Sequence, residues 1–326
     1  MKRNWLQVFT GMLALAFIAA FYSPSQAAPP YPSRDITVII TWGAGGTSDL
    51  SCRQLADPMG KILGKTIIPL NVVGGSGAIG MNQGAHARAD GYTITFVTSG
   101  PTVIQPWVQK VTYDPTKDFI PVAQVFGEYL VVVAKSDAPY KNLKEMADYF
   151  KKIGKSPKFA TPGAGSNNHL SMVLLSKAIG IPMTHVPFSS SAEGVNAVIG
   201  GNVDIASTEP PSAVGPAKEG RAHILAILSA SRLDLLREVP TVKEQGYDLV
   251  FGGWNGILVP KGTPKEVVDK LADAAKRALE NETLIKNSAI VGRPIEFLSG
   301  PEFGERIKKE LARNGEIIKA EGLAVK

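Results

Sequence analysis

Residues 35–49 read DITVIITWGAGGTSD, and this stretch decides the fold. Ile36–Ile40 is a β-branched apolar run of the kind found in a strand that is covered on both faces. The glycine turn Gly43–Gly46 follows, and a helical pattern then begins, for which Thr47–Asp49 supply N-cap groups. A strand that feeds a glycine turn and a helix presents free backbone N–H groups at the carboxyl end of a sheet. Such groups bind an anion without a cationic side chain.

The first 28 residues have the pattern of a targeting segment. Lys2-Arg3 is a positive start, Leu6–Phe21 is apolar, and Ser25-Gln26-Ala27 is a small-residue cleavage pattern. The apolar run is short for a membrane span. We therefore expect a cleavable signal peptide of residues 1–27 and an exported mature chain.

Composition limits the class of protein. The formal net charge of +6 includes the two cations of the expected signal peptide, and the other basic residues are scattered among acids. This pattern predicts a solvated surface and no nucleic-acid partner. The remaining roughly 300 residues suit two domains. Cys52 is the single cysteine, so no internal disulfide can form, and we expect a buried core residue rather than a reactive thiol.

Short strands alternate with helical patterns along the whole chain. Ile36–Ile40, Thr66–Val73 and Tyr92–Thr98 each run into a Gly/Ser loop. This alternation predicts parallel α/β sheets, in which ligands bind outside the carboxyl ends of the strands. The second half repeats the pattern with the expected strands Phe159–Thr161, Thr184–Phe188 and Val203–Ser207.

Two apolar strands are candidates for crossings between domains. They are Tyr129–Ala134 and Gly253–Pro260, whereas Asp118–Pro121 reads as irregular, turn-forming sequence. The expected division is a signal peptide (1–27), a first lobe made of residues 28–128 and 254–326, and a second lobe made of residues 129–253.

Three motifs suggest enzymes or nucleotide binding, and each is incomplete. Gly75–Gly80 matches GxGxxG, but no acid follows a second strand at the spacing of a dinucleotide site. Gly43–Ser48 lacks the lysine of a P-loop. Gly74–Ala78 misses GxSxG in its last position. An exported hydrolase that uses Ser76 or Ser166 therefore stays an alternative hypothesis.

A few side chains at strand ends are candidates for ligand contact. His169 starts a helix beside Gly163–Ser166 and could orient that loop. Glu209 could pair with a cationic or hydroxylated part of a ligand, or it could be a solvated loop acid. Trp42 and Phe188 could form an aromatic wall or pack in the core. The four histidines lack the spacing of a metal site, so we expect no metal.

Eleven short motifs follow one another over nearly the whole expected mature chain. They are Tyr31–Ile36, Trp42–Asp49, Gly74–Gly80, Asp90–Thr93, Tyr113–Pro115, Asp118–Pro121, Gly163–Ser166 with His169, His185–Phe188, Gly200–Asp204, Val239–Thr241 and Gly262–Pro264. In this order and spacing they resemble the Bug family of extracytoplasmic solute receptors, the binding components of tripartite tricarboxylate transporters.

The resemblance implies a periplasmic protein with the type II periplasmic-binding-protein fold, in which two α/β lobes joined by two crossing segments close on a solute. It implies that backbone N–H groups, small hydroxyls and water hold a carboxylate, with no cofactor. Carried over, the ligand-binding residues are Ala44, Gly45, Gly46, Asp49, Ser76 and Ser99 from one lobe, and Gly165, Ser166, Ser189 and Ser190 from the other.

This sequence departs from the family at two places. Gly43-Ala44 stand where members often have a proline pair. Ser189–Ser191 stand where members often have a lysine-glycine or glycine run, in the loop that should face the variable end of the solute.

The leading hypothesis is a receptor, not an enzyme, for a small organic carboxylate. Binding by lobe closure requires a ligand that bridges both lobes. The expected partner is a tripartite tricarboxylate transporter in the membrane, and the alternative is a sensor kinase; the receptor itself is expected to be a monomer. We expect Gly45→Asp to abolish binding.

Overall fold

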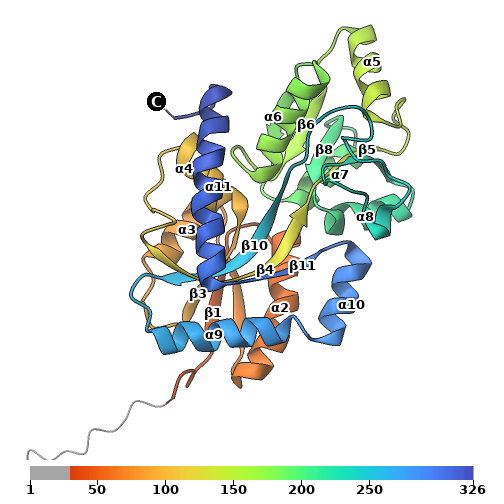
Figure 1. The fold of residues 1–326 in the computed structure, drawn as a ribbon. Coiled ribbons are helices and arrows are strands. Elements are labelled where there is room, and N and C mark those ends of the chain that lie inside the picture. The colour runs from red at the N-terminus through yellow and green to blue at the C-terminus, as the bar shows by residue number, and fades with distance from the viewer. Residues whose placement is uncertain (1–29, 326) are drawn as a thin grey trace, which may run out of the picture. The chain divides into compact units, whose positions relative to one another are not determined.

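The computed structural model describes residues 30–325, and the fold lies in the unit that begins at Arg34. The predicted signal peptide, residues 1–27, lies outside the described residues. Two β-sheets organise the unit, each with helices packed on it (Figure 1). We call the elements of the six-stranded sheet lobe A and those of the five-stranded sheet lobe B.

The sheet of lobe A is mixed rather than parallel. Its strand order is β11 (Ile295–Ser299), β4 (Phe119–Tyr129), β10 (Gly252–Pro260), β3 (Thr93–Thr98), β1 (Ile36–Ile40) and β2 (Ile67–Asn71). Strand β1 pairs in parallel with β2 and β3, as predicted. Strand β10 is antiparallel to both its neighbours, and β11 is antiparallel to β4. The expectation of a parallel sheet is therefore right for the first three strands and wrong for the other three.

The sheet of lobe B repeats this design. Its order is β7 (Thr184–Pro187), β6 (Lys158–Thr161), β8 (Ile205–Thr208), β5 (Val131–Lys135) and β9 (Ala222–Ile227). Strand β6 pairs in parallel with β7 and β8. Strand β5 is antiparallel to β8 and β9, so the parallel prediction again holds for one part of the sheet.

The long strand β4 contradicts the prediction of irregular structure at Asp118–Pro121. A proline cannot donate a ladder hydrogen bond, and it is tolerated at edges and bulges. Pro121 meets both conditions, because β11 pairs only with the Ala123–Phe126 part of β4 and the pairing with β10 shifts register near Leu258. The strand therefore continues to Tyr129 and carries Glu128 to its end.

Helices fill the connections between strands. The longer ones are α2 (Thr47–Leu63), α3 (Ala78–Ala85), α5 (Leu143–Ile153), α6 (Asn167–Ile179), α7 (Ser191–Ile199), α8 (Pro210–Lys218), α9 (Lys265–Ala278), α10 (Glu282–Val291) and α11 (Gly300–Ala320). Short turns complete the set: η1 (Gly75–Gly77), η2 (Gly100–Ile104), α4 (Gln105–Val108) and η3 (Asp234–Leu236). In Figure 1, α9 and α11 flank the lobe A strands, and α5–α8 surround lobe B.

Two links connect the lobes. Leu130 alone separates β4 from β5, and the segment Leu228–Phe251 connects β9 to β10. The links touch, since the Leu228 N–H donates to the Leu130 carbonyl at 2.9 Å. In Figure 1, β4 and β10 run side by side from the lower sheet toward lobe B.

Apolar burial explains how the chain is held together without a disulfide. Trp254 is fully buried and packs edge-on against Phe303, with ring centroids 4.7 Å apart, while its indole N–H donates to Glu310. This fixes α11 on β10. Cys52 is buried as expected, and burial raises its thiol pKa, so the thiol is inert.

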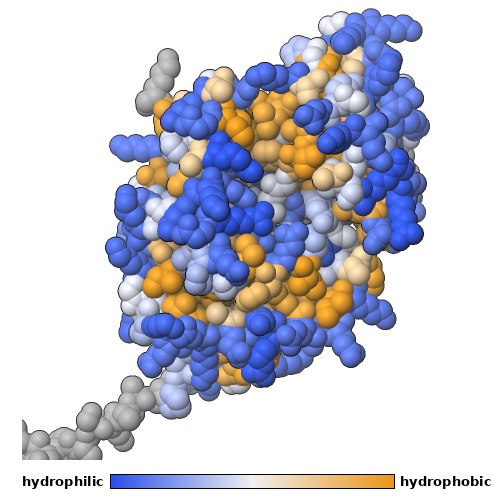
Figure 2. Space-filling view, in the orientation of Figure 1, coloured by the Kyte–Doolittle hydropathy of each residue, from blue (hydrophilic) through white to orange (hydrophobic). Residues whose placement is uncertain are grey.

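The visible surface is mostly hydrophilic. In Figure 2, hydrophilic residues cover α11 and the outer face of α9, and a band of hydrophobic residues lies just above α9. Among the described residues no helix combines the length and the apolar character needed to cross a membrane.

Candidate binding site

A polar cavity lies where the two lobes meet. Its lining comprises Trp42, Gly46, Thr47, Ser48, Thr98 and Glu128 from lobe A, and Pro162, Asn167, Asn168, Ser190, Ser191 and Glu209 from lobe B. The cavity has a volume of about 20 Å³. In this closed arrangement the cavity has room for little more than one water, so a solute enters only when the lobes separate.

Three helices begin at the cavity and aim their N-terminal amides at it. The first turns of α2, α6 and α7 contribute Thr47, Asn167 and Ser191 to the lining. The first N–H groups of a helix have no intrahelical partner, and the helix dipole makes this end positive. Helix α8 differs, because Pro210-Pro211 removes its first two N–H donors. Glu209, at its N-cap, supplies a carboxylate instead.

The N-cap of α2 is Gly46, which contradicts the expectation that Thr47–Asp49 cap this helix. Asp49 turns back and accepts hydrogen bonds from the Gly45 N–H (3.0 Å), Arg53 Nε (2.9 Å) and Asn71 Nδ2 (3.0 Å). Burial opposes its ionisation, but these donors prevail and lower the Asp49 pKa. Asp49 therefore holds the glycine turn in place and does not line the cavity.

The glycine turn touches lobe B directly. A Cβ on Gly46 would lie 3.2 Å from Ser190 Cβ, and one on Gly43 would lie 3.2 Å from the Ser189 carbonyl oxygen. Nearby, the hydroxyls of Thr47 and Ser212 share a hydrogen bond of 2.8 Å across the lobes. A side chain at either glycine would therefore force its neighbour in lobe B to shift by a few tenths of an ångström.

Gln105 makes a second connection between the lobes, where its Nε2 donates to the Ala164 carbonyl at 2.6 Å. Gly163 packs against Ser76 in the same region, and a Cβ on Gly165 would meet Gln105 and Val108. The predicted loop residues Ser76 and Gly165 therefore serve the contact between lobes and do not line the cavity.

Trp42 forms one wall of the cavity. The side chain is 7 % exposed, and its indole N–H donates to Thr98 Oγ1 at 2.9 Å, which fixes the ring. The prediction of an aromatic wall matches this position. Phe188, the other aromatic candidate, packs against a hydrophobic cluster of lobe B that includes Ala160 and Ala206. It does not line the cavity.

Glu209 is 4 % exposed and has two donors from lobe B. Its Oε1 accepts from Asn168 Nδ2 at 3.0 Å and its Oε2 accepts from Ser191 Oγ at 2.7 Å. Glu128 reaches the same cavity from lobe A. Burial raises the Glu128 pKa well above its ordinary range, and the neighbouring Glu209 carboxylate raises it further.

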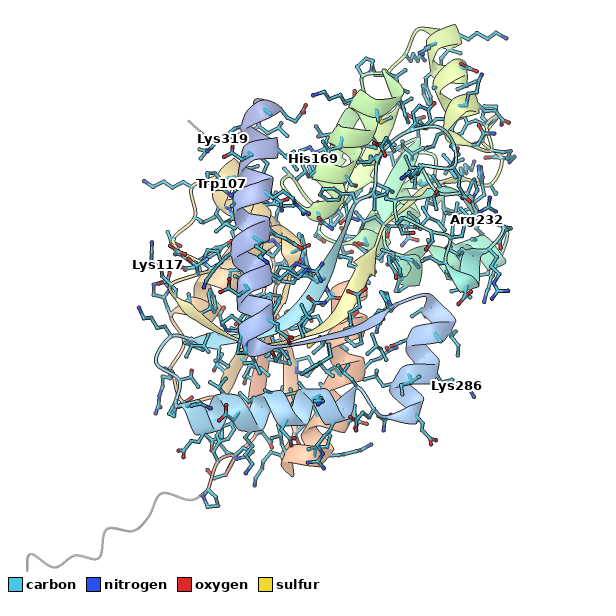
Figure 3. All side chains as sticks on the ribbon, viewed as in Figure 1. Trp107, Lys117, His169, Arg232, Lys286 and Lys319 are labelled. Carbon is cyan, nitrogen blue, oxygen red and sulfur yellow. The ribbon has the colours of Figure 1, made fainter. Side chains whose placement is uncertain are left out.

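His169 orients a loop, as the sequence indicated. Its Nδ1 accepts from the Gly165 N–H at 3.0 Å, and its backbone N–H donates to the N-cap hydroxyl of Ser166 at 3.1 Å. The ring stacks on His185 with centroids 4.1 Å apart (Figure 3 labels His169 on α6). Burial lowers the His169 pKa to about 4, so the ring is neutral at ordinary pH.

Four predicted residues line the cavity: Trp42, Gly46, Ser190 and Glu209. The others lie near it without lining it: Ala44, Gly45, Asp49, Ser76, Ser99, Gly165, Ser166, His169, Phe188 and Ser189. The Ser189 N–H and hydroxyl both bind Glu193. Ala44 and Gly45 are exposed on the outer side of the turn.

Sequence reasoning missed eight lining residues: Thr47, Ser48, Thr98, Glu128, Pro162, Asn167, Asn168 and Ser191. Most of them sit one or two positions from a predicted residue, at the first turn of a helix. The rule that helix starts face the cleft would have found these. Glu128 was hidden because its strand was not predicted.

No lysine, arginine or histidine is among the residues that line the cavity. In Figure 3 the labelled cations Lys117, Arg232 and Lys286 project at the outer edge, away from β4 and β10. Among the described residues no group of three His, Cys, Asp or Glu side chains has the geometry to hold a metal ion. The site offers amides, hydroxyls, two carboxyl groups and an indole.

Comparison with known proteins places this geometry in context. The sequence model of the family described as "Tripartite tricarboxylate transporter family receptor" matches residues 51–323. Among solved structures, the periplasmic binding protein BugD is 29% identical, with a TM-score of 0.87, and the match covers 91% of this chain and 100% of BugD.

Two further structures contain ligands. MatC from Rhodopseudomonas palustris with bound malate is 29% identical, with a TM-score of 0.83, covering 88% of this chain and 100% of MatC. Rpa4515 from R. palustris with adipate is 26% identical, with a TM-score of 0.86, covering 90% of this chain and 99% of that one. These similarities confirm the predicted fold class of two α/β lobes joined by two crossing segments.

Proposed function

The chain belongs to the tripartite tricarboxylate transporter receptor family, and from this premise we propose that it captures a small organic carboxylate between its lobes in the periplasm. The family and the similar structures are solute receptors and not enzymes. The serine-hydrolase alternative is therefore set aside. Ser166, one of its two candidate nucleophiles, is fully buried and caps α6.

The convergence of three helix N-termini on a cavity with no cationic lining carries the proposal. Backbone amides at helix starts bind carboxylates by oriented N–H groups and by the helix dipole. Two of the similar structures hold malate and adipate, which are acids of the proposed class.

The proposal includes the residues and the partner. The carboxylate lies against the first turns of α2, α6 and α7, beside Gly46, Thr47, Asn167 and Ser191, with Trp42 as a wall. The lobes are residues 28–128 with 254–326 and residues 129–253, and a signal peptide of residues 1–27 directs export. The loaded receptor docks on a tripartite tricarboxylate transporter in the membrane, and a sensor kinase is the alternative partner.

Thermal-shift screening of mono-, di- and tricarboxylates and aromatic acids tests the ligand class. A ligand that binds the native state raises Tm, by several degrees when its concentration far exceeds Kd. In the structure Gly45 faces open space, whereas Gly46 lines the cavity against Ser190. The variant that tests the site is therefore Gly46→Asp, in place of the Gly45→Asp expected from the sequence. Gly46→Asp should abolish the shift while the fold survives.

Gly45→Asn is the matched control, because asparagine tolerates the positive φ of 77° at this position and the side chain would meet no neighbour. It should keep the shift. A screen in which no carboxylate raises Tm, or a Gly46→Asp variant that binds normally, would contradict the proposed function.

A further inference from the structure

Two glutamates from opposite lobes meet inside the cavity. Glu128 lies at the end of β4 in lobe A, and Glu209 lies at the N-cap of α8 in lobe B. Both line the same cavity, and the Glu209 carboxylate is close enough to raise the pKa of Glu128. A site built to hold only anions gains nothing from two acids at its centre, because like charges repel.

The pair has acceptor capacity that the protein does not use. Each Glu209 oxygen accepts one hydrogen bond, from Asn168 and from Ser191. Glu128 Oε2 accepts a long bond of 3.4 Å from Asn167. A carboxylate has about four acceptor sites, so both groups can take further donors from a ligand.

Ser99 adds a buried hydroxyl beside the pair. Its side chain is 1 % exposed, and its hydroxyl lies beside the Glu128 carboxyl, whose pKa it lowers, without making a hydrogen bond of good geometry. Ser99, the Glu128 carboxyl and Asn167 all lie close to one point above Gly253. A ligand group that completes the hydrogen bonding of this buried hydroxyl would be favoured.

No protein cation neutralises the pair inside the cavity. Arg306 and Arg313 line a separate cavity on the other side of Glu128. Arg306 is already engaged there, with Glu310 at 2.8 Å and Gln124 at 2.9 Å. Closure of the lobes is therefore favoured when Glu128 is protonated or when a cation lies between the two carboxyl groups.

We propose that Glu128 and Glu209 recognise a protonated amino group, so that the receptor takes an amino-carboxylic acid whose carboxylate lies at the helix N-termini. This inference rests on the proposed function and specifies its ligand. An ammonium group supplies three N–H donors and one positive charge, which match the free acceptors and take the place of a proton on Glu128. A plain dicarboxylate instead brings negative charge to the pair and binds only with proton uptake.

Calorimetry with matched acids at neutral pH tests the inference. The pairs are succinate and aspartate, glutarate and glutamate, and adipate and 2-aminoadipate, in which each second acid adds one amino group to the same skeleton. For the skeleton that fits, the amino acid should bind at least about tenfold more tightly, which corresponds to about 1.4 kcal/mol. Equal affinities, or tighter binding of the plain acid, would overturn the inference.

Glu209→Gln should bring the affinity ratio of the two acids close to one. The matched control is Glu219→Gln, which removes one charge from the exposed far end of the same helix and should keep the ratio. A ratio that survives in Glu209→Gln would contradict the assignment.

A third test measures, on the unmodified protein, the number of protons taken up when each acid binds. Titrations in two buffers of different ionisation enthalpy should show that the plain dicarboxylate takes up about one proton more than its amino counterpart. Equal proton uptake would overturn the inference. If carboxylates bind without preference for the amino group, the inference fails and the proposed function stands; if no carboxylate binds, the proposed function fails as well.

Discussion

At the scale of single residues, a neutral histidine pair holds the loop that touches lobe A. His169 accepts from the Gly165 N–H, and His185 Nε2 shares a hydrogen bond of 2.7 Å with the Thr161 hydroxyl. Burial lowers the pKa of each ring to about 4. Protonation of His169 at Nδ1 would put a donor against the Gly165 N–H and break this contact.

We predict that the free energy of unfolding depends on His169 below pH 6.5. Because the folded-state pKa is lowered from 6.5 to about 4, the unfolded chain binds more protons in this window. The contribution of His169 to the free energy of unfolding is therefore fully present above pH 6.5 and is lost as the pH falls toward 4. The contribution is at most about 3 kcal/mol, and less because the ring is partly exposed.

The variant His169→Gln keeps an acceptor and removes the titration. Urea unfolding at several pH values should give a shallower loss of stability than in the unmodified protein, and His185 should supply the remaining slope. Identical pH profiles for the two proteins would contradict this role.

The role of a residue could be predicted from the sequence where a local rule applies. The wall position of Trp42 and the loop contact of His169 follow from their places next to strand ends. That Glu209 lines the same cavity as Glu128 could not be predicted, because Glu128 comes from a distant strand in the other lobe. A contact made by closure leaves no local pattern.

At the scale of elements, caps fix the helix starts that face the cavity. Ser190 accepts from the Glu193 N–H and caps α7, as Asn142 accepts from the Glu145 N–H and caps α5. Ser190 also lines the cavity. The cap of α2 was not predicted correctly, because a glycine fills it and Asp49 binds the turn instead.

We predict that Ser190→Ala and Asn142→Ala have similar effects on stability and different effects on binding. Loss of either cap should lower the free energy of unfolding by about 1 kcal/mol. Only Ser190→Ala should also weaken the ligand, because it loosens a helix start that the ligand touches. Denaturant unfolding and calorimetry measure both quantities, and equal affinities for the two variants would place the ligand away from α7.

The sequence predicts a strand well when its own residues show the pattern, and poorly when the strand depends on partners far along the chain. Strand β1 and its parallel neighbours are apolar runs with turn signals, so the sequence indicates them well. The start of strand β4, with Pro121, reads as irregular from the sequence alone, because its partners β10 and β11 come from the far end of the chain. The mixed direction of both sheets depends on those long-range pairings.

At the scale of the whole unit, hydrogen bonds across the lobes hold this closed arrangement. Thr47 and Ser212 share one, and Gln105 donates to Ala164 in another. The two-lobe fold could be predicted because the alternation of strands and helices repeats in both halves. How closely the lobes approach depends on side chains that meet only after folding.

We predict that the double variant Thr47→Cys/Ser212→Cys locks the lobes when oxidised. The two hydroxyl oxygens lie 2.8 Å apart, which brings both side chains within the reach of a disulfide. The oxidised protein should neither take up nor release ligand in stopped-flow fluorescence, and reductant should restore exchange. Thr47→Cys alone is the control, and Cys52 is buried and does not compete. Unchanged exchange after oxidation would contradict lobe closure around Thr47.

Leu130 sets the geometry of that motion. It is the one residue between a strand of the first sheet and a strand of the second, it is fully buried, and its carbonyl is tied to Leu228 in the other link. A joint of one residue has two soft torsions, and the bond to the second link couples them. Any separation of the lobes must therefore turn the chain at Leu130 and carry the second link with it, or break the bond between the two links. The two crossings act as one joint, so a change in the cleft is passed to the back of the molecule at this single point.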